Sequence, residues 1–173
     1  IRMQKIYVEN IKEVLRNKNK LEKELEIKMK YKGKDIFVDG KAEKEFIAIE
    51  VLKAINLGFS VNSALMLKQE NFILQTINIK DVTKRSDLKV IKSRIIGTHG
   101  KTLKTLKNLT GCNLALQDNQ IGIIGDAEEI ADAIQAITSI IQGSKQSNVY
   151  GKLEKQRKRR RLENNSVSLN FSE

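Results

Sequence analysis

Two segments of the sequence have the same predicted order of secondary structure, and this repeat restricts the possible folds more than any other feature. In each segment the apolar periodicity indicates a strand, two helices, a hairpin of two strands and a long helix. With a shift of 85 residues, Gly40, Ala42, Glu43, Ala48 and Ile49 align with Gly125, Ala127, Glu128, Ala133 and Ile134. The repeat predicts an α+β protein built from two similar units.

The element boundaries follow from local patterns in each half. In the first half we expect strands at residues 3–8, 27–31 and 35–39, and helices beginning near residues 9, 21 and 41. Residues 60–69 form a predicted connecting helix capped by Ser60. In the second half we expect strands at 72–82, 113–117 and 121–124, and helices at 87–96, 101–109 and 127–142.

A short glycine-containing segment lies between the first two helices of the second half. It reads Ile95-Ile96-Gly97-Thr98-His99-Gly100-Lys101. Glycine tolerates positive φ and lets another backbone approach, and the first amides of the following helix have no partners within the helix. Such a loop is a seat for an anion such as phosphate, although two glycines with this spacing also suit a tight helix–helix turn.

The charge of the chain favours a polyanionic partner. Lys and Arg number 32 against 21 Asp and Glu, which gives a net charge of +11. A single cysteine, Cys112, with a single histidine, His99, cannot build a structural zinc site. The lone cysteine fits a reducing compartment, and we expect a cytoplasmic protein. Because no Asp/Glu cluster has metal-site spacing and no nucleophile system is recognisable, we expect neither a nuclease nor any other enzyme, and no cofactor.

Residues 95–111 (IIGTHGKTLKTLKNLTG), in this order of elements, resemble a KH domain of the eukaryotic type, type I. The resemblance implies two KH domains of type I in tandem, each with a three-stranded antiparallel sheet packed against three helices. Residues 1–70 would be a degenerate KH domain that includes the connector at 60–69. Residues 71–150 would be a KH domain with its GxxG loop at 97–100, and residues 151–173 a basic helix end and a disordered tail.

In that family the GxxG loop clamps the backbone of single-stranded RNA, and an adjacent groove holds the bases. On a helical wheel Lys101, Lys104 and Lys107 lie opposite Leu103, Leu106 and Leu109, so that one face packs and the other stays basic. We expect Leu103, Leu114 and Leu116 near the groove. The predicted RNA-binding residues are Arg94, Ile95, Ile96, Gly97, Thr98, His99, Gly100, Lys101, Lys104, Lys107, Leu114, Lys152 and Arg157.

Two further segments are similar to the Partner-of-NOB-one (PNO) family of ribosome-assembly factors. Residues 55–65, followed by 72–74 and 79–82, match the joint between its two KH domains, and Asn148-Val149-Tyr150-Gly151-Lys152 matches the segment after its last helix. The resemblance implies binding to the 3′ end of small-subunit rRNA precursor. It also implies that the protein acts together with the PIN-domain rRNA endonuclease and contacts the α subunit of translation initiation factor two. The short N-terminal segment favours an archaeal-type member.

The first half lacks the two glycines. Asn17 and Lys20 stand where Gly97 and Gly100 stand in the second half. We therefore expect the first half to dock proteins and the second to bind RNA. On this interpretation the fold keeps its shape without the glycines, and RNA explains why Gly97 and Gly100 remain. A tandem-KH binder of other RNAs and an interaction scaffold are the alternatives.

The end of the chain is strongly basic. Between residues 150 and 161 the cations outnumber the single acidic residue, Glu154: they are Lys152, Lys155, Arg157, Lys158, Arg159, Arg160 and Arg161. A second phosphate contact is expected here, with a frayed helix end or a localisation-type basic run as the alternatives. Residues 162–173 are polar without periodicity, and we expect disorder.

Overall fold

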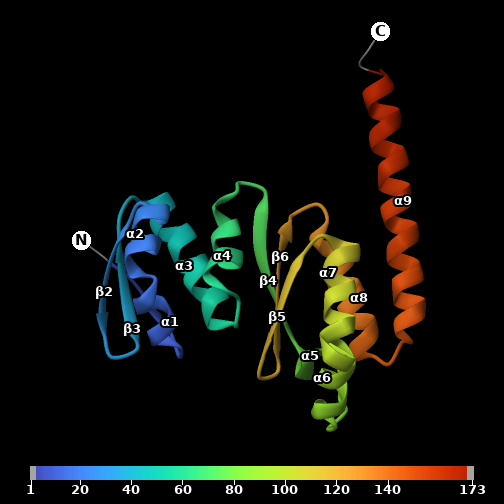
Figure 1. Ribbon diagram of the computed structural model, residues 1–173, viewed down its shortest axis with the longest axis horizontal. Coiled ribbons are helices and arrows are strands. Elements are labelled where there is room, and N and C mark those ends of the chain that lie inside the picture. Colours follow the sequence, from blue (N-terminus) through green and yellow to red (C-terminus); the bar gives the residue numbers. More distant parts are fainter. Residues whose placement is uncertain (1–2, 171–173) are drawn as a thin grey trace. The chain divides into compact units, whose positions relative to one another are not determined.

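The computed structural model describes residues 3–170, which form an α+β fold with two three-stranded antiparallel sheets (Figure 1). The chain divides into two compact units. The first unit contains the described residues up to Thr76 together with Asn113–Ala127. The second unit contains Ile77–Cys112 and the described residues from Glu128 onward.

The first unit begins with the predicted strand–helix–helix–strand–strand–helix series. Its elements are β1 (Gln4–Tyr7), α1 (Ile11–Arg16), α2 (Lys18–Leu25), β2 (Lys28–Lys32), β3 (Asp35–Asp39) and α3 (Ala42–Asn56). The sheet order is β1-β3-β2, and β3 pairs antiparallel with both neighbours. The hairpin turn at Lys32-Gly33-Lys34 is as predicted, with Gly33 at φ 62°.

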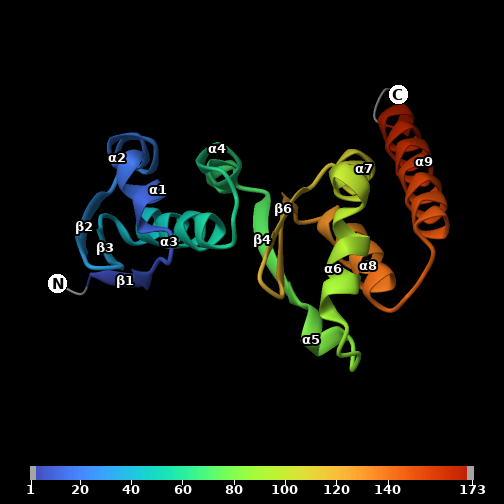
Figure 2. The same ribbon diagram turned by 60° about the horizontal axis from the view of Figure 1, so that its bottom comes forward.

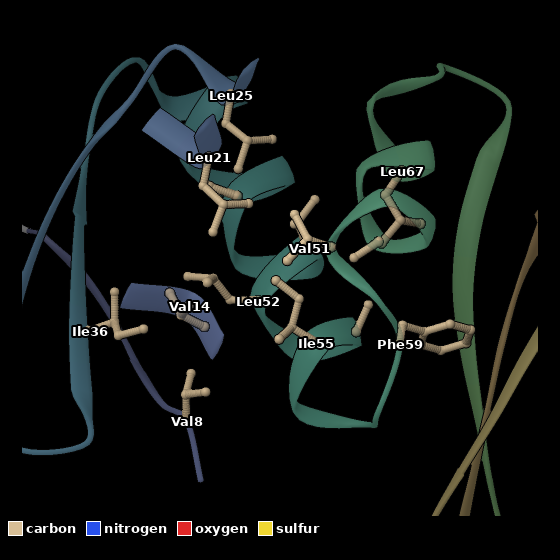
Figure 3. Close-up of a cluster of buried hydrophobic side chains, with 14 of the residues drawn as sticks. Val8, Val14, Leu21, Leu25, Ile36, Val51, Leu52, Ile55, Phe59 and Leu67 are labelled. Carbon is tan, nitrogen blue, oxygen red and sulfur yellow. The ribbon is translucent and has the colours of Figure 1, made fainter. Parts of the chain in front are cut away.

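One face of this sheet carries the core of the first unit. Alternation along β3 points Ile36 and Val38 inward, where they are buried with Val14, Leu21 and Leu52 from the three helices. Figure 3 shows Ile36, Val14, Leu21 and Leu52 gathered between the sheet and the helices. The predicted apolar stripe of residues 41–57 packs here because its apolar positions recur with helical spacing.

The predicted connector is one turn of α-helix followed by a 3₁₀ helix. α4 (Val61–Ala64) begins after Ser60, whose Oγ accepts a hydrogen bond from the Ser63 amide at 3.1 Å, and η1 (Leu65–Lys68) follows. The second sheet consists of β4 (Phe72–Asn78), β5 (Asn113–Gln117) and β6 (Gln120–Asp126) in the order β4-β6-β5. The β5–β6 turn at Asp118-Asn119 is as predicted.

Most of the second sheet belongs to the first unit, while Ile77 and Asn78 at the end of β4 belong to the second. Gly122 of β6 lies so close to the Phe59 ring that an added Cβ would stand 2.6 Å from Phe59 Cε2. Ala115 and Ile124 belong to the same buried cluster as the first core. In Figure 3 the Phe59 ring points away from the first sheet and toward β4. The predicted division near residue 70 differs from these units, and the sequence domains 1–70 and 71–150 stay a prediction.

The second unit consists of helices. They are α5 (Ile79–Val82), α6 (Leu88–Ile96), η2 (Thr98–Gly100), α7 (Lys101–Thr110), α8 (Ile130–Ile141) and α9 (Gln146–Asn170). Figure 2 shows α6 beside α8, and the core of the unit contains Ile91, Ile95, Leu106, Ile137 and Ile140, all fully buried. In residues 3–170 no helix is long and apolar enough to cross a membrane.

The strand predicted for residues 72–82 is too long. β4 ends at Asn78, and residues 79–82 form the short helix α5. The Asn78 side chain accepts a hydrogen bond from the Lys80 amide at 3.0 Å, which begins the helix and ends the strand. The alternation of apolar residues continues past Asn78, so the pattern alone predicts a longer strand.

The prediction of disorder from residue 162 is corrected by the structure, in which α9 continues to Asn170. Residues 152–170 contain no glycine or proline, and the basic run consists of good helix formers, so nothing ends the helix earlier. In Figure 1 the C-terminal part of α9 extends beyond α7 and α8. Residues 171–173 of the predicted tail lie outside the described residues.

Candidate nucleic-acid interface

The GxxG loop (Gly97–Gly100) joins α6 to α7 through an unusual backbone path. Gly97 has φ 75° and ψ 172°, a region open essentially only to glycine. His99 and Gly100 follow with φ values of 52° and 72° in the left-handed region. The Gly97 amide donates to the Ser93 carbonyl at 2.8 Å, which ends α6, and the Gly100 amide donates to the Gly97 carbonyl at 3.1 Å. The loop is therefore a defined turn that opens α7.

The two glycines are required for different reasons. A Cβ on Gly97 would lie 2.2 Å from Thr102 Oγ1 and 2.6 Å from the Thr102 amide nitrogen. At Gly100 a Cβ would meet no atom within 4 Å. The interpretation that RNA explains both glycines is therefore wrong for Gly97, which the close packing of the loop on Thr102 requires. Gly100 is open to solvent, where a ligand backbone can approach.

The rest of the loop and the start of α7 present exposed polar groups. Thr98, His99, Lys101 and Lys104 are exposed, and Lys107 is half-buried. Within residues 3–170 none of these lysines forms an ion pair with the protein. Leu106 is fully buried while Leu103 and Leu109 are half-buried, as the wheel predicted. The structure thus brings the loop and two free lysines together on one surface.

Two predicted contacts have other roles. Arg94 donates to the carbonyl oxygens of Ile140, at 2.9 Å, and Ser144, so its guanidinium caps the end of α8. Ile95 is fully buried in the core of the second unit, whereas the adjacent Ile96 is 37% exposed. Arg94 and Ile95 therefore position the loop. Of the two isoleucines, only Ile96 is exposed enough to contact a base.

A hollow beside the loop is lined in part by residues that the sequence analysis did not predict as RNA-binding. It is lined by Lys89, Val90 and Ser93 of α6, by Thr102 of α7, by Gln146 at the start of α9 and by the loop itself. Lys89, Ser93 and Gly97 recur every four residues, a spacing that could have identified the α6 face. Gln146 is distant in sequence, and no local pattern indicates it.

The remaining predicted residues are not among those that line the hollow. Leu114 is buried on β5, which belongs to the first unit, so its place in a base-binding groove stays a prediction. Lys152 is exposed on α9. Arg157 donates to the Asn108 carbonyl at 3.4 Å, at the end of α7, so it fastens α9 to the unit.

Cys112 is not placed as a nucleophile. It is 3% exposed, and burial raises the pKa of its thiol, which donates to the Thr110 carbonyl at 3.6 Å. A thiol in this state is protonated near neutral pH and is poorly reactive.

The corresponding joint of the first unit has no such loop. A single residue, Asn17, separates α1 from α2, and its side chain donates to the Glu13 carbonyl at 2.9 Å. Lys20 donates to the Asn62 side chain at 2.6 Å. These polar groups are occupied by the protein itself, so the joint is a closed helix–helix corner.

A model of a known protein family matches the part of the chain that contains the GxxG loop. The family model for the second KH domain of PNO1, a eukaryotic-type KH domain (KH-domain type I), matches residues 73–158. Residues 73–158 are therefore a KH domain of the PNO1 type. The match includes the GxxG loop, α7 and the part of α9 that Arg157 fastens.

Two relatives match a large part of this chain. A KH domain-containing protein of Methanocaldococcus jannaschii is 29% identical over 154 residues, which cover 82% of this chain and 66% of that protein. The pre-rRNA-processing protein PNO1 of Debaryomyces hansenii is 36% identical over 107 residues, covering 60% of this chain and 42% of that protein. The chain thus spans about two thirds of the first relative and less than half of the second.

Solved structures share the fold. Dim2p from Pyrococcus horikoshii has a TM-score of 0.82 at 24% identity, with 90% of this chain and 99% of that chain covered. The a/eIF2α–Dim2p–rRNA complex from the same organism contains a chain with a TM-score of 0.83 at 23% identity, with 91% and 94% covered. At these identities the likeness concerns the fold.

Proposed function

We propose that the chain is a non-enzymatic RNA-binding protein that holds the 3′ end of small-subunit rRNA precursor during ribosome maturation. The observation that carries this proposal is the GxxG loop, with Gly100 open to solvent next to two unpaired lysines. KH domains clamp single-stranded RNA with this loop. In this chain Gly97, Thr98, His99 and Gly100 would form the clamp, and Ile96, Lys101 and Lys104 would flank it.

The choice of RNA rests on the relatives. PNO1 of Debaryomyces hansenii is a pre-rRNA-processing protein, and the Dim2p complex of Pyrococcus horikoshii contains rRNA and a/eIF2α. By the same argument we propose the α subunit of translation initiation factor two and the PIN-domain rRNA endonuclease as partners. In a tandem arrangement the second KH domain would bind RNA. The first half, whose helix–helix corner is closed, would dock proteins. A cytoplasmic location belongs to the same proposal.

The experiment is a titration of the protein with a small-subunit rRNA 3′-end oligonucleotide and with a scrambled oligonucleotide of equal length. Gly100→Asp should weaken binding by more than tenfold, because a carboxylate at the clamp repels phosphate. Gly100→Asn is the matched control, since asparagine has the same shape without the charge and tolerates left-handed backbone. Unchanged binding by Gly100→Asp would mean that the loop is only a turn. Equal affinity for both oligonucleotides would contradict recognition of the rRNA 3′ end.

A second control addresses the first unit. Asn17→Gly combined with Lys20→Gly restores the glycines at the corner but not the four-residue loop. We expect RNA affinity to change by less than about twofold, since no open cradle forms there. A large gain in affinity would show that the first unit can clamp RNA after all.

A further inference from the structure

The cations of α9 fall into two groups with different environments. Val149 and Leu153 are buried, Arg157 bonds the Asn108 carbonyl, and Arg160 forms an ion pair with Asp132. These residues share one face of the helix, and this face is fastened to α7 and α8. The arginines on it are used by the protein, so they are not free for a ligand.

The opposite face carries the basic stripe, defined as Lys155, Lys158 and Arg159. These residues are spaced i, i+3 and i+4, which places their side chains side by side on a helix. All three are exposed, and no ion pair among residues 3–170 involves them. Three uncompensated cations on one rigid face attract phosphate.

The direction of α9 connects the basic stripe with the loop. Gln146, its first residue, donates to the Arg94 carbonyl at 3.4 Å and lines the hollow beside Gly97. Eleven residues later Arg157 reaches Asn108, near the end of α7. At about 1.5 Å per residue the basic stripe lies roughly 14 to 20 Å along the axis from Gln146. An RNA of four nucleotides held in the GxxG loop is too short to reach the basic stripe as well.

We propose that the basic stripe is a second RNA contact, engaged only by RNA that extends beyond the nucleotides held in the GxxG loop. The proposal rests on the proposed function and replaces Arg157 with Lys155, Lys158 and Arg159 as phosphate ligands. Phosphate is favoured over a membrane surface because residues 152–170 contain no aromatic side chain, and the large apolar residues at helical spacing from the basic stripe are two leucines, Leu162 and Leu169.

The test compares a four-nucleotide RNA with one of about 20 nucleotides from the rRNA 3′ end. The variant Lys155→Ala, Lys158→Ala, Arg159→Ala keeps helix-forming residues at exposed positions, so it should fold normally. For the long RNA we measure the slope of the logarithm of the affinity against the logarithm of the salt concentration, called the salt slope. Its magnitude should be smaller by about 2 in the variant, because the variant loses three phosphate contacts and each contributes about 0.7 on single strands. The unmodified protein should then lose about 20-fold more affinity than the variant between about 50 and 200 mM salt. For the short RNA the two proteins should bind equally.

The matched control is Lys12→Ala, Lys30→Ala, Lys32→Ala, which removes three exposed and unpaired lysines from the first unit. It should leave the salt slope for the long RNA unchanged. If the control lowered the salt slope for the long RNA by the same amount, the effect would come from net charge alone, and the proposal would be overturned. A loss on the short RNA would show that the basic stripe acts through the loop, and an unchanged slope on the long RNA would leave it a protein-docking face; either result overturns the proposal. Gly100→Asp should lose both RNAs, so failure of the clamp is distinguishable from failure of the basic stripe.

Discussion

An added Cβ at Gly97 would overlap Thr102, whereas one at Gly100 would enter open solvent. Gly97→Ala should therefore lower the free energy of unfolding by about 2 kcal/mol or more, through clash and a glycine-only backbone region. Gly100→Ala should cost about 1 kcal/mol from its positive φ alone. Chemical denaturation of both variants measures the difference, and equal losses would contradict the assigned packing. The sequence motif predicts both glycines, but it cannot tell which one the fold requires.

His99 shows what residue-level reasoning could reach. The motif places it between two glycines, and its side chain is exposed. Arg94 shows the limit, because its position before the loop suggested an RNA contact while its guanidinium bonds carbonyls 46 and 50 residues away. Pairing across such distances depends on how helices pack, which a local pattern does not contain.

Among the elements, the joint between α2 and β2 depends on one carboxylate. Glu22 Oε1 accepts hydrogen bonds from the Met29 amide at 2.8 Å and Lys18 Nζ at 3.0 Å, and its side chain is 14% exposed. The Met29 amide, followed by the more weakly contributing Lys18, lowers the pKa of Glu22 below its usual value of 4.5. This stabilisation is present above the unfolded-state pKa and is lost as pH falls through the lower folded-state pKa.

Glu22→Gln should accordingly reduce the free energy of unfolding by about 1 to 2 kcal/mol at pH 7. The gap between the variant and the unmodified protein should narrow as pH falls through the lowered folded-state pKa of Glu22, because the carboxylate then becomes protonated. Urea titrations over a series of pH values from 7 downward measure this, with Glu70→Gln, an exposed residue, as the control. A gap that persisted at low pH would mean that the glutamine distorts packing instead.

On the scale of the whole molecule, Phe59 attaches the second sheet to the first unit. Its ring is 5% exposed and packs against Gly122. Phe59→Ala should lower the free energy of unfolding by about 3 to 5 kcal/mol, because it leaves a cavity. Phe46→Ala removes the same ring from a site that is 68% exposed and should cost less than about 0.5 kcal/mol. Similar losses from the two variants in denaturation curves would contradict this account.

By itself the sequence determined the α+β class, the order of the elements and the place of the GxxG loop. These depend on apolar periodicity and on glycine, which act over a few neighbouring residues. The tertiary structure decided that the second sheet packs with the first unit, that Gly97 serves the fold, and that Arg157 fastens α9 while Lys155 stays free. Those outcomes come from contacts between residues far apart in the chain, so only the folded chain shows which cations remain available to RNA.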